Sequence, residues 1–187
     1  MIAERITVKR LYSKYSHQLD IKDDEKDPVD PATWAKVNIP KRFRSRRASD
    51  NKTTSLYCNS AEFNLLMAKY KSRVTSIRRP LDADCEQMIL AGYDISIREN
   101  LWYAKFRYSV QFYLPTHENA LDLDDWITNT YGTNRKNQDY KFRRSRYFPT
   151  LYCVDSWMID LIKLSEPAKV VNISKVCTFN EVAAAIR

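Results

Sequence analysis

Apolar and polar side chains alternate most regularly in residues 102–114, which read WYAKFRYSVQFYL. A β-strand turns successive side chains to opposite faces of its sheet, so this alternation predicts one long strand with a buried and an exposed face. The buried face is predicted to hold Trp102, Ala104, Phe106, Tyr108, Val110, Phe112 and Leu114. The exposed face is predicted to hold Tyr103, Lys105, Arg107, Ser109, Gln111 and Tyr113.

Helical patterns separate the predicted strands. Residues 30–37 begin with Asp30 as N-cap and Pro31 in the first turn, which is typical of a helix start. Residues 60–72, with Ser60 as the expected cap, carry apolar side chains at the i, i+3, i+4 and i+7 spacing of a buried helical stripe. Further helices are predicted at residues 82–93, 121–132, 155–165 and 178–187.

The same elements recur in the same order along the chain. The segment FRSRR (43–47) returns as FRRSR (142–146), and each copy is followed by the tripeptide LYC. Upstream of both, residues 6–15 align with residues 95–106. Several matches in one order indicate an internal repeat of a whole unit, because a single shared motif could arise by chance.

The repeat predicts two domains, residues 1–93 and 94–187. Each contains a strand, a helix, one long strand or a hairpin, a helix, a strand and a trailing helix. Helices packed on one face of a small, mostly antiparallel sheet form a two-layer α+β unit, and the ferredoxin-like arrangement is the common way to build it. The predicted fold class is therefore α+β, with two tandem ferredoxin-like two-layer units from an internal duplication.

In topology, the chain resembles proteins built from tandem ferredoxin-like or RNA-recognition-type modules, including duplicated RNA-binding and RNA-processing subunits of CRISPR systems. The resemblance implies a nucleic-acid partner. The only glycines, Gly92 and Gly132, cannot supply the glycine-containing RNA-recognition signatures or a glycine-rich nucleotide loop. The resemblance therefore assigns no catalytic residue, and no cofactor is expected.

Charge supports the same class of partner. The chain has 31 Lys and Arg against 23 Asp and Glu, which gives a formal charge of +8. Such a balance favours nucleic acid first and an anionic membrane surface second, although a basic protein need not bind either. No apolar run is long enough to span a membrane, so no membrane partner is predicted.

The cysteines and histidines argue against a metal site. None of the four cysteines forms a CxxC pair, and His17 and His117 lie far apart in the sequence. We therefore expect reduced thiols, a cytoplasmic location and no bound metal. Cys58 and Cys153 follow matched Leu-Tyr pairs and are predicted to be buried.

The arginine-rich segments are the principal candidate site, because guanidinium groups bind phosphate and stack on bases. The alternative is a solvated basic edge that protects a strand from aggregation. Tyrosines on an open sheet face stack unpaired bases, unless that face packs on the other copy. The predicted nucleic-acid-binding residues are Arg42, Arg44, Arg46, Arg47, Tyr103, Lys105, Arg107, Tyr113, Arg143, Arg144 and Arg146. We expect the arginines of both copies to line one positive surface.

These features favour a non-catalytic binder of single-stranded nucleic acid, with RNA preferred to DNA. One alternative is a small metal-independent endoribonuclease, for which His17 is the candidate general base. The other is a structural or adaptor subunit of a larger nucleoprotein assembly, which would bind other protein subunits. The short, duplicated, glycine-poor chain would suit a phage or mobile-element protein.

Overall fold

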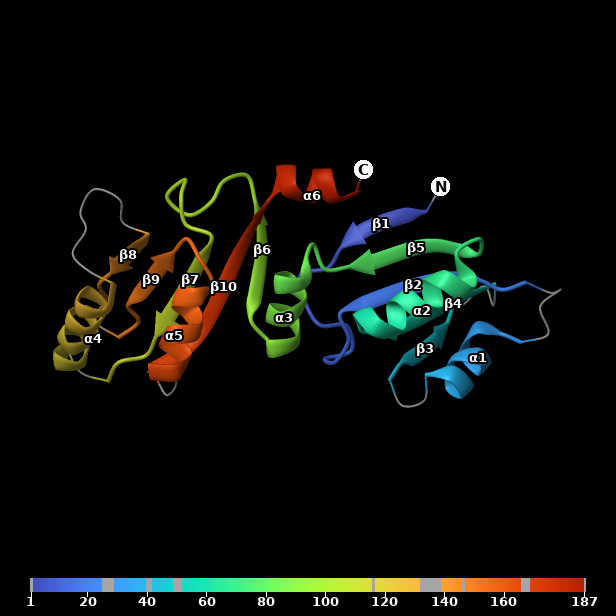
Figure 1. Ribbon diagram of the computed structural model, residues 1–187, viewed down its shortest axis with the longest axis horizontal. Coiled ribbons are helices and arrows are strands. Elements are labelled where there is room, and N and C mark those ends of the chain that lie inside the picture. Colours follow the sequence, from blue (N-terminus) through green and yellow to red (C-terminus); the bar gives the residue numbers. More distant parts are fainter. Residues whose placement is uncertain are drawn as a thin grey trace. The chain divides into compact units, whose positions relative to one another are not determined.

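The computed structural model describes residues 2–24, 29–39, 42–48, 52–115, 117–131, 139–145, 147–165 and 169–186 (Figure 1). The chain divides into two compact units. The first comprises Met1–Gly92 together with Val182–Arg187, and the second comprises Tyr93–Glu181. Each unit has its own sheet and its own hydrophobic core.

The first unit contains a five-stranded sheet in the order β1-β5-β2-β4-β3. Its strands are β1 (Ala3–Ile6), β2 (His17–Lys22), β3 (Arg44–Arg47), β4 (Thr53–Cys58) and β5 (Val74–Arg79). Its helices are α1 (Pro31–Asn38), α2 (Ser60–Tyr70) and α3 (Ala83–Ala91). Strand β1 runs parallel to β5, and the other neighbours are antiparallel.

The second unit repeats this topology, with the sheet order β6-β10-β7-β9-β8. Its strands are β6 (Asp94–Arg98), β7 (Tyr108–Phe112), β8 (Tyr140–Arg143), β9 (Thr150–Cys153) and β10 (Val170–Thr178). Its helices are α4 (His117–Tyr131) and α5 (Trp157–Ser165), and α6 (Phe179–Ile186) follows β10. Strand β6 is again the parallel edge strand.

The prediction of two tandem α+β units is confirmed. Without β1 and β6, each sheet has the strand order and the strand–helix alternation of a ferredoxin-like fold. The basic segment and LYC form a hairpin in each unit, which decides between the two alternatives left open by the sequence. The added parallel edge strand was not part of the predicted unit.

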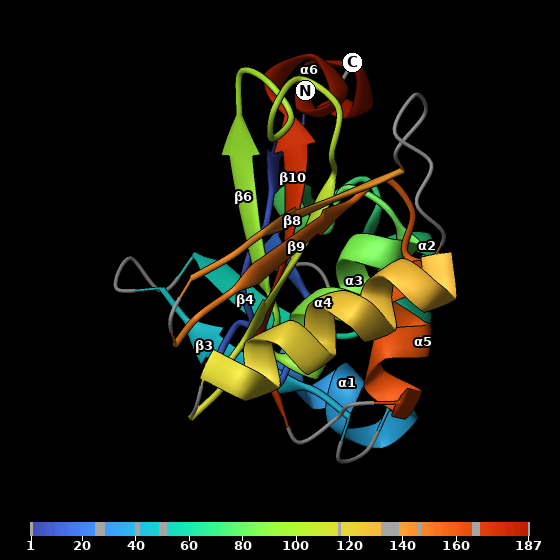
Figure 2. The same cartoon turned by 90° about the vertical axis from the view of Figure 1, so that its left-hand side faces the viewer.

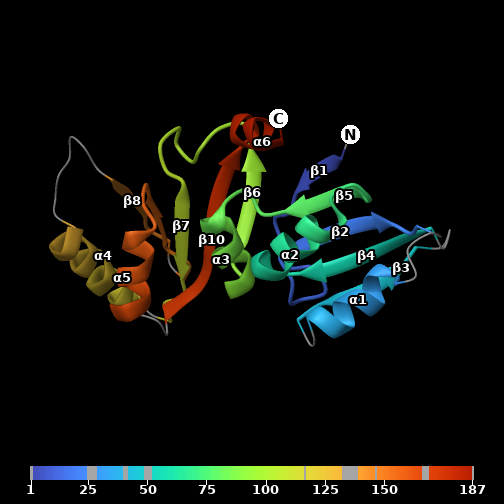
Figure 3. The same cartoon turned by 45° about the vertical axis from the view of Figure 1, so that its right-hand side comes forward.

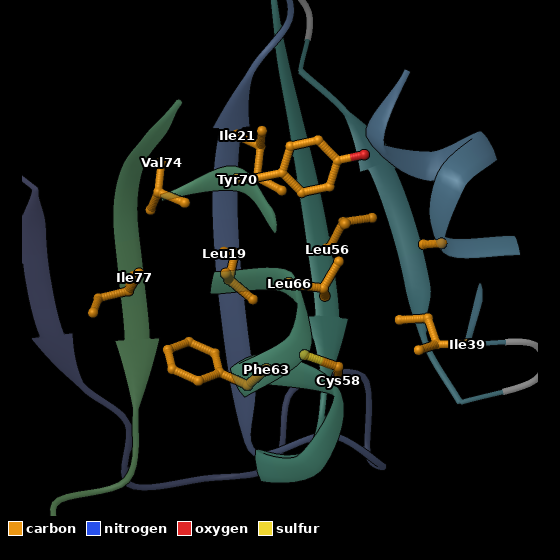
Figure 4. Packing of buried hydrophobic residues seen from close by; sticks show 11 residues of the cluster. Leu19, Ile21, Ile39, Leu56, Cys58, Phe63, Leu66, Tyr70, Val74 and Ile77 are labelled. Atoms are coloured by element: carbon orange, nitrogen blue, oxygen red, sulfur yellow. The ribbon is translucent and has the colours of Figure 1, made fainter. Parts of the chain in front are cut away.

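The core of the first unit lies between the sheet and helices α1 and α2 (Figures 3 and 4). Strand residues Leu19 and Leu56 pack with Phe63, Leu66 and Tyr70 of α2, which form the predicted helical stripe. The second unit has the equivalent core beneath α4 and α5 (Figure 2). Its buried residues include Val110, Phe112, Leu123, Ile127, Leu151, Met158, Ile162 and Ile173.

The predicted helix N-caps are confirmed only in part. Asp30 caps α1 as predicted, because its carboxylate accepts hydrogen bonds from the backbone N–H groups of Ala32 and Thr33. The expected cap of α2 is wrong by one residue, since Asn59 and not Ser60 occupies that position. The predicted helix end at Gly132 lies outside the described residues.

The predicted strand over residues 102–114 is too long. Strand β7 covers only Tyr108–Phe112, and residues 102–106 form a tight turn in which Trp102 and Phe106 face each other. The strand was predicted too long because Trp102 and Phe106, on either side of the turn, continue the alternating pattern of β7. Tyr103 and Lys105 therefore lie on a turn and not on a strand.

None of the helices in the described residues is both long and apolar enough to cross a membrane.

Candidate nucleic-acid interface

A five-residue turn occurs once in each unit, immediately before the first core strand. In residues 11–15, the Leu11 N–H donates to the Tyr15 carbonyl at 2.7 Å and the Lys14 N–H donates to the Leu11 carbonyl at 3.2 Å. In residues 102–106, the equivalent distances are 3.0 and 3.1 Å. The identical bonding places the two turns at equivalent positions in the two units.

Both turns hold a tyrosine in left-handed backbone geometry. The φ angles are +50° at Tyr12 and +59° at Ser13, and they are +51° at Tyr103 and +57° at Ala104. Two successive positive φ angles are typical of a type I′ turn, where Gly, Asn and Asp are the usual residues. A bulky residue in this region is strained, so its presence in both units suggests a role for the tyrosine itself.

The turn in the first unit places Tyr12 against two side chains of the neighbouring hairpin. The Tyr12 ring meets the Tyr57 ring edge to face, with 4.5 Å between the ring centroids. The guanidinium carbon of Arg44 lies 3.9 Å from the centroid of Tyr12. We call Tyr12, Tyr57 and Arg44 the first tyrosine cluster.

The second unit has the same arrangement. The Tyr103 ring meets the Tyr152 ring edge to face at 5.1 Å, and the Lys141 ammonium lies 3.6 Å from the Tyr103 centroid. Arg44 is opposite Tyr57 in the first hairpin, as Lys141 is opposite Tyr152 in the second. Tyr103, Tyr152 and Lys141 are therefore the second tyrosine cluster.

This pairing corrects the alignment of the two arginine-rich segments. Arg44 is equivalent to Lys141, and Arg46, which is opposite Ser55, is equivalent to Arg143, which is opposite Thr150. Matching FRSRR to FRRSR by letter places the copies out of register, because the hairpin pairing with LYC sets the true equivalence.

Each cluster combines an exposed aromatic ring with a cation. Tyr12 is 38% exposed and Tyr103 is 51% exposed. A hydrogen bond from Tyr57, followed by one from Arg46, lowers the pKa of the Tyr12 hydroxyl. Burial, more than its bond to Tyr12, raises the pKa of Tyr57. Tyr12 and Tyr103 are therefore partly open to solvent, and each carries a cation over its ring.

The first tyrosine cluster lies on the face of the sheet opposite the buried leucines. One row of neighbours crosses all five strands on that face, and it consists of Arg5, Arg78, Gln18, Tyr57 and Arg44. The next row consists of Ala3, Ser76, Asp20, Ser55 and Arg46. We call these two rows the first open face.

The arginines of the first open face lack carboxylate partners. Within the described part of the chain, none of Arg5, Arg44, Arg46 and Arg78 forms an ion pair. The single carboxylate of these rows, Asp20, accepts hydrogen bonds from Gln18 at 2.8 Å, from Ser55 at 2.6 Å and from Ser76. The face is thus strongly positive and suits a polyanion.

Three other predicted arginines are paired with acids. Arg42 lies 3.6 Å from Glu62, and Arg47 donates to Asp23 at 3.0 Å. Arg144 donates to Asp124 from its Nε at 2.9 Å. These three arginines lie in or next to β3 and β8 in the sequence. Their charges are balanced by acids within the protein.

The remaining predicted residues of the second unit are dispersed. Arg107 binds both carboxylate oxygens of Glu181, at 2.6 and 3.1 Å, and Lys105 lies 3.8 Å from Asp139. Tyr113 is exposed and packs beside Phe148 at 5.6 Å. Arg143 is exposed on β8, and Arg146 lies outside the described residues.

The sequence analysis missed Arg5, Arg78 and Lys141. Their signal was the strand alternation in AERI, VTSIRR and YKFR, which places each on the face opposite the core. Composition alone does not show which arginines share a face, whereas their alternating positions along each strand do.

Nine residues form the second open face. Its first row consists of Asp94, Ser174, Ser109, Tyr152 and Lys141. Its second row consists of Asn172, Gln111, Thr150 and Arg143. This surface is polar but carries two cations, Lys141 and Arg143, against the four arginines of the first open face.

His17 sits in a different environment from the tyrosine clusters. It is buried beside Phe63, and its Nδ1 lies 2.8 Å from the Ser16 hydroxyl, which donates to Glu86 at 2.6 Å. Burial lowers the pKa of His17. His17 borders a cavity of about 320 Å³ near the start of α3, and its counterpart in the second unit is Tyr108.

No group of three or more potential metal-ligating side chains occurs among the described residues.

Cys58 and Cys153 are free and fully buried, as predicted. Each lies beneath a core helix, directly after the tyrosine of its cluster. Burial raises the pKa of Cys153 to about 12 and raises that of Cys58 as well. These thiols are therefore packing residues and not nucleophiles.

Comparison with known proteins found no matching family model, no matching curated protein and no matching solved structure.

Proposed function

We propose that this protein binds single-stranded nucleic acid, RNA before DNA, through the first open face and the two tyrosine clusters. The observation that carries the proposal is the tyrosine turn, which recurs in both units with a cation over the ring. Unpaired bases stack on exposed aromatic rings, and adjacent cations hold the phosphates that connect them.

The unpaired arginines support the same proposal. A phosphate that binds Arg44 or Arg46 does not have to displace a protein carboxylate, because neither has one among the described residues. Every base has a ring face, so stacking and charge together give binding that depends weakly on sequence. RNA is favoured because its recognition commonly targets unpaired bases laid on a sheet.

The decisive experiment compares two pairs of arginines in the same hairpin. Arg44 and Arg46 are replaced by alanine in one variant, and Arg42 and Arg47, which face Glu62 and Asp23, are replaced in the matched control. Affinity for fluorescent single-stranded RNA is measured by anisotropy across a series of salt concentrations.

We expect the Arg44 and Arg46 variant to bind more weakly at low salt and to show a flatter salt dependence. On single strands each lost phosphate contact changes the slope of log K against log salt by about 0.7. The control pair should keep the parental slope. If both variants bind RNA and single-stranded DNA like the parent at every salt concentration, the proposal is wrong and an adaptor role takes its place.

The same samples test for cleavage. RNA labelled at its end and incubated without metal should stay intact, because His17 is buried and its counterpart is a tyrosine. Cleavage that is lost in a His17→Ala variant would instead establish an endoribonuclease.

A further inference from the structure

We propose that the two open faces have different roles in recognition: the first supplies affinity, and the second selects bases through the side-chain amides of Gln111 and Asn172. This inference rests on the proposed function and assigns the affinity to one unit and the sequence preference to the other. Its ligand is an unpaired base stacked on Tyr103.

The two faces differ at equivalent positions of one topology. Arg78 and Ser174 are equivalent because each pairs with the β2 or β7 residue that faces the LYC tyrosine. At the adjoining edge strand, Arg5 beside Arg78 is replaced by Asp94 beside Ser174. The second open face thus has two cations, Lys141 and Arg143, where the first has four arginines.

The second row shows the opposite change, from a satisfied carboxylate to an available amide. In the first unit, the Asp20 carboxylate already accepts hydrogen bonds from Gln18, Ser55 and Ser76. Gln111 takes the place of Asp20, opposite Thr150 and Asn172. Within the described residues the partly exposed Gln111 amide makes no hydrogen bond, so its donor and acceptor are both available.

Asn172 adds a second amide beside Gln111. Its nitrogen donates to Asp94 at 2.8 Å and to Ser174 at a longer 3.4 Å, which fixes the orientation of the side chain. Its amide oxygen has no donor among the described residues and can accept a hydrogen bond from a base. A fixed amide discriminates better than a mobile one because less order is lost on binding.

Amides suit the edges of bases for a geometric reason. A glutamine or asparagine amide presents one donor beside one acceptor, and a base edge presents the complementary pair. Gln111 lies one row from Tyr152, and successive residues on one face of a strand are about 7 Å apart. A base stacked on Tyr103, which contacts Tyr152, therefore has its edge within reach of Gln111.

The test is selection from a random single-stranded RNA library, with the bound sequences counted. We expect the full-length parent to enrich one base at one position by about tenfold over the others, since a two-point amide contact gives discrimination of that order. Gln111→Ala should reduce the preference to about twofold or less. Gln111→Glu, which keeps the volume but removes the donors, should also lose it.

The matched comparison is the variant with alanine at Arg44 and Arg46. It should bind more weakly but keep the parental base preference, while Gln111→Ala should retain most of its affinity for homopolymeric RNA. Far-ultraviolet circular dichroism of every variant establishes that the fold is retained.

Two results would overturn the inference. If the parent binds RNA with no base preference, or if Gln111→Glu and Gln111→Ala keep the preference, the second open face does not read bases and the proposed function still stands. If the parent binds no RNA or single-stranded DNA at low salt, both proposals fall together.

Discussion

Single residues in the two turns carry the strongest functional signal. Tyrosine at a positive φ angle is disfavoured, and glycine or asparagine would form the same turn with less strain. The strain recurs at Tyr12 and Tyr103, and each ring lies beneath a cation from the adjacent hairpin. The turn itself does not require this combination, which supports the proposed stacking role of the two tyrosines.

Replacement of Tyr12 by alanine should weaken RNA binding by about 1–3 kcal/mol, because one stacking platform is lost. Tyr12→Phe retains the ring and should bind within about twofold of the parent. Anisotropy titrations at one fixed salt concentration measure both. Equal affinity of the alanine variant and the parent would remove Tyr12 from the interface.

Replacement of Ala104 by glycine should stabilise the protein by about 0.5–1 kcal/mol, because glycine adopts the observed φ of +57° without a clash. Ala91→Gly, in the last turn of α3, is the control and should destabilise by up to about 1 kcal/mol. Equilibrium unfolding in urea measures both changes. A destabilised Ala104→Gly variant would contradict the left-handed geometry.

At the level of elements, an ion pair links the start of β7 to the start of α6. Thr178 and Glu181 cap α6 reciprocally, since the Thr178 N–H donates to Glu181 at 2.7 Å and the Glu181 N–H donates to the Thr178 hydroxyl at 3.3 Å. Arg107 then binds the same carboxylate through two hydrogen bonds. Arg107 thus contributes its charge to this network within the second unit.

The network should make stability depend on pH. The bond from Arg107, above all other causes, lowers the pKa of Glu181 to about 2 from its ordinary 4.5. A carboxylate with a lowered pKa stabilises the folded state above its ordinary pKa, and this contribution is lost as the pH falls from 4.5 towards 2.

Glu181→Gln should therefore lower the free energy of unfolding at pH 7 by about 1 kcal/mol, as for other partly exposed ion pairs. The difference between parent and variant should shrink as the pH falls through the same window. Urea unfolding at several pH values measures that difference. A difference that stays constant down to pH 2 would show that the charge of Glu181 contributes nothing.

At the scale of the whole molecule, net charge is a poor guide to the proposed binding surface. The chain carries a formal charge of +8, yet several arginines are balanced by acids within their own unit. Four arginines that form no ion pair among the described residues lie on the first open face, where strand pairing places Arg5, Arg78 and Arg44 in one row. The expected joint surface of the two arginine-rich segments stays a prediction.

The salt dependence of the parent should reflect this surface. Four phosphate contacts on a single strand give a slope of about −3 in log K against log salt, at about −0.7 for each contact. Arg5→Ala and Arg78→Ala should each make the slope less steep by about 0.7. A parental slope that neither substitution changes would place the phosphate contacts elsewhere.

The duplication, the order of the elements and most buried positions could be predicted from the sequence. These features are local or repeat locally: the alternation in residues 108–112, the helical stripe of α2 and the matched LYC tripeptides all express their pattern within a few residues. The burial of Cys58 and Cys153 followed from the same matched positions.

Only the tertiary structure decided which arginines are available for a ligand. Arg107 pairs with Glu181 and Arg144 with Asp124 across long stretches of chain, and no local spacing encodes such partners. The tight turn at residues 102–106 was likewise hidden, because it continues the alternation of the strand. Strand register then joined Arg5, Arg78 and Arg44 in one row, because hydrogen bonding between distant strands fixes which side chains share a face.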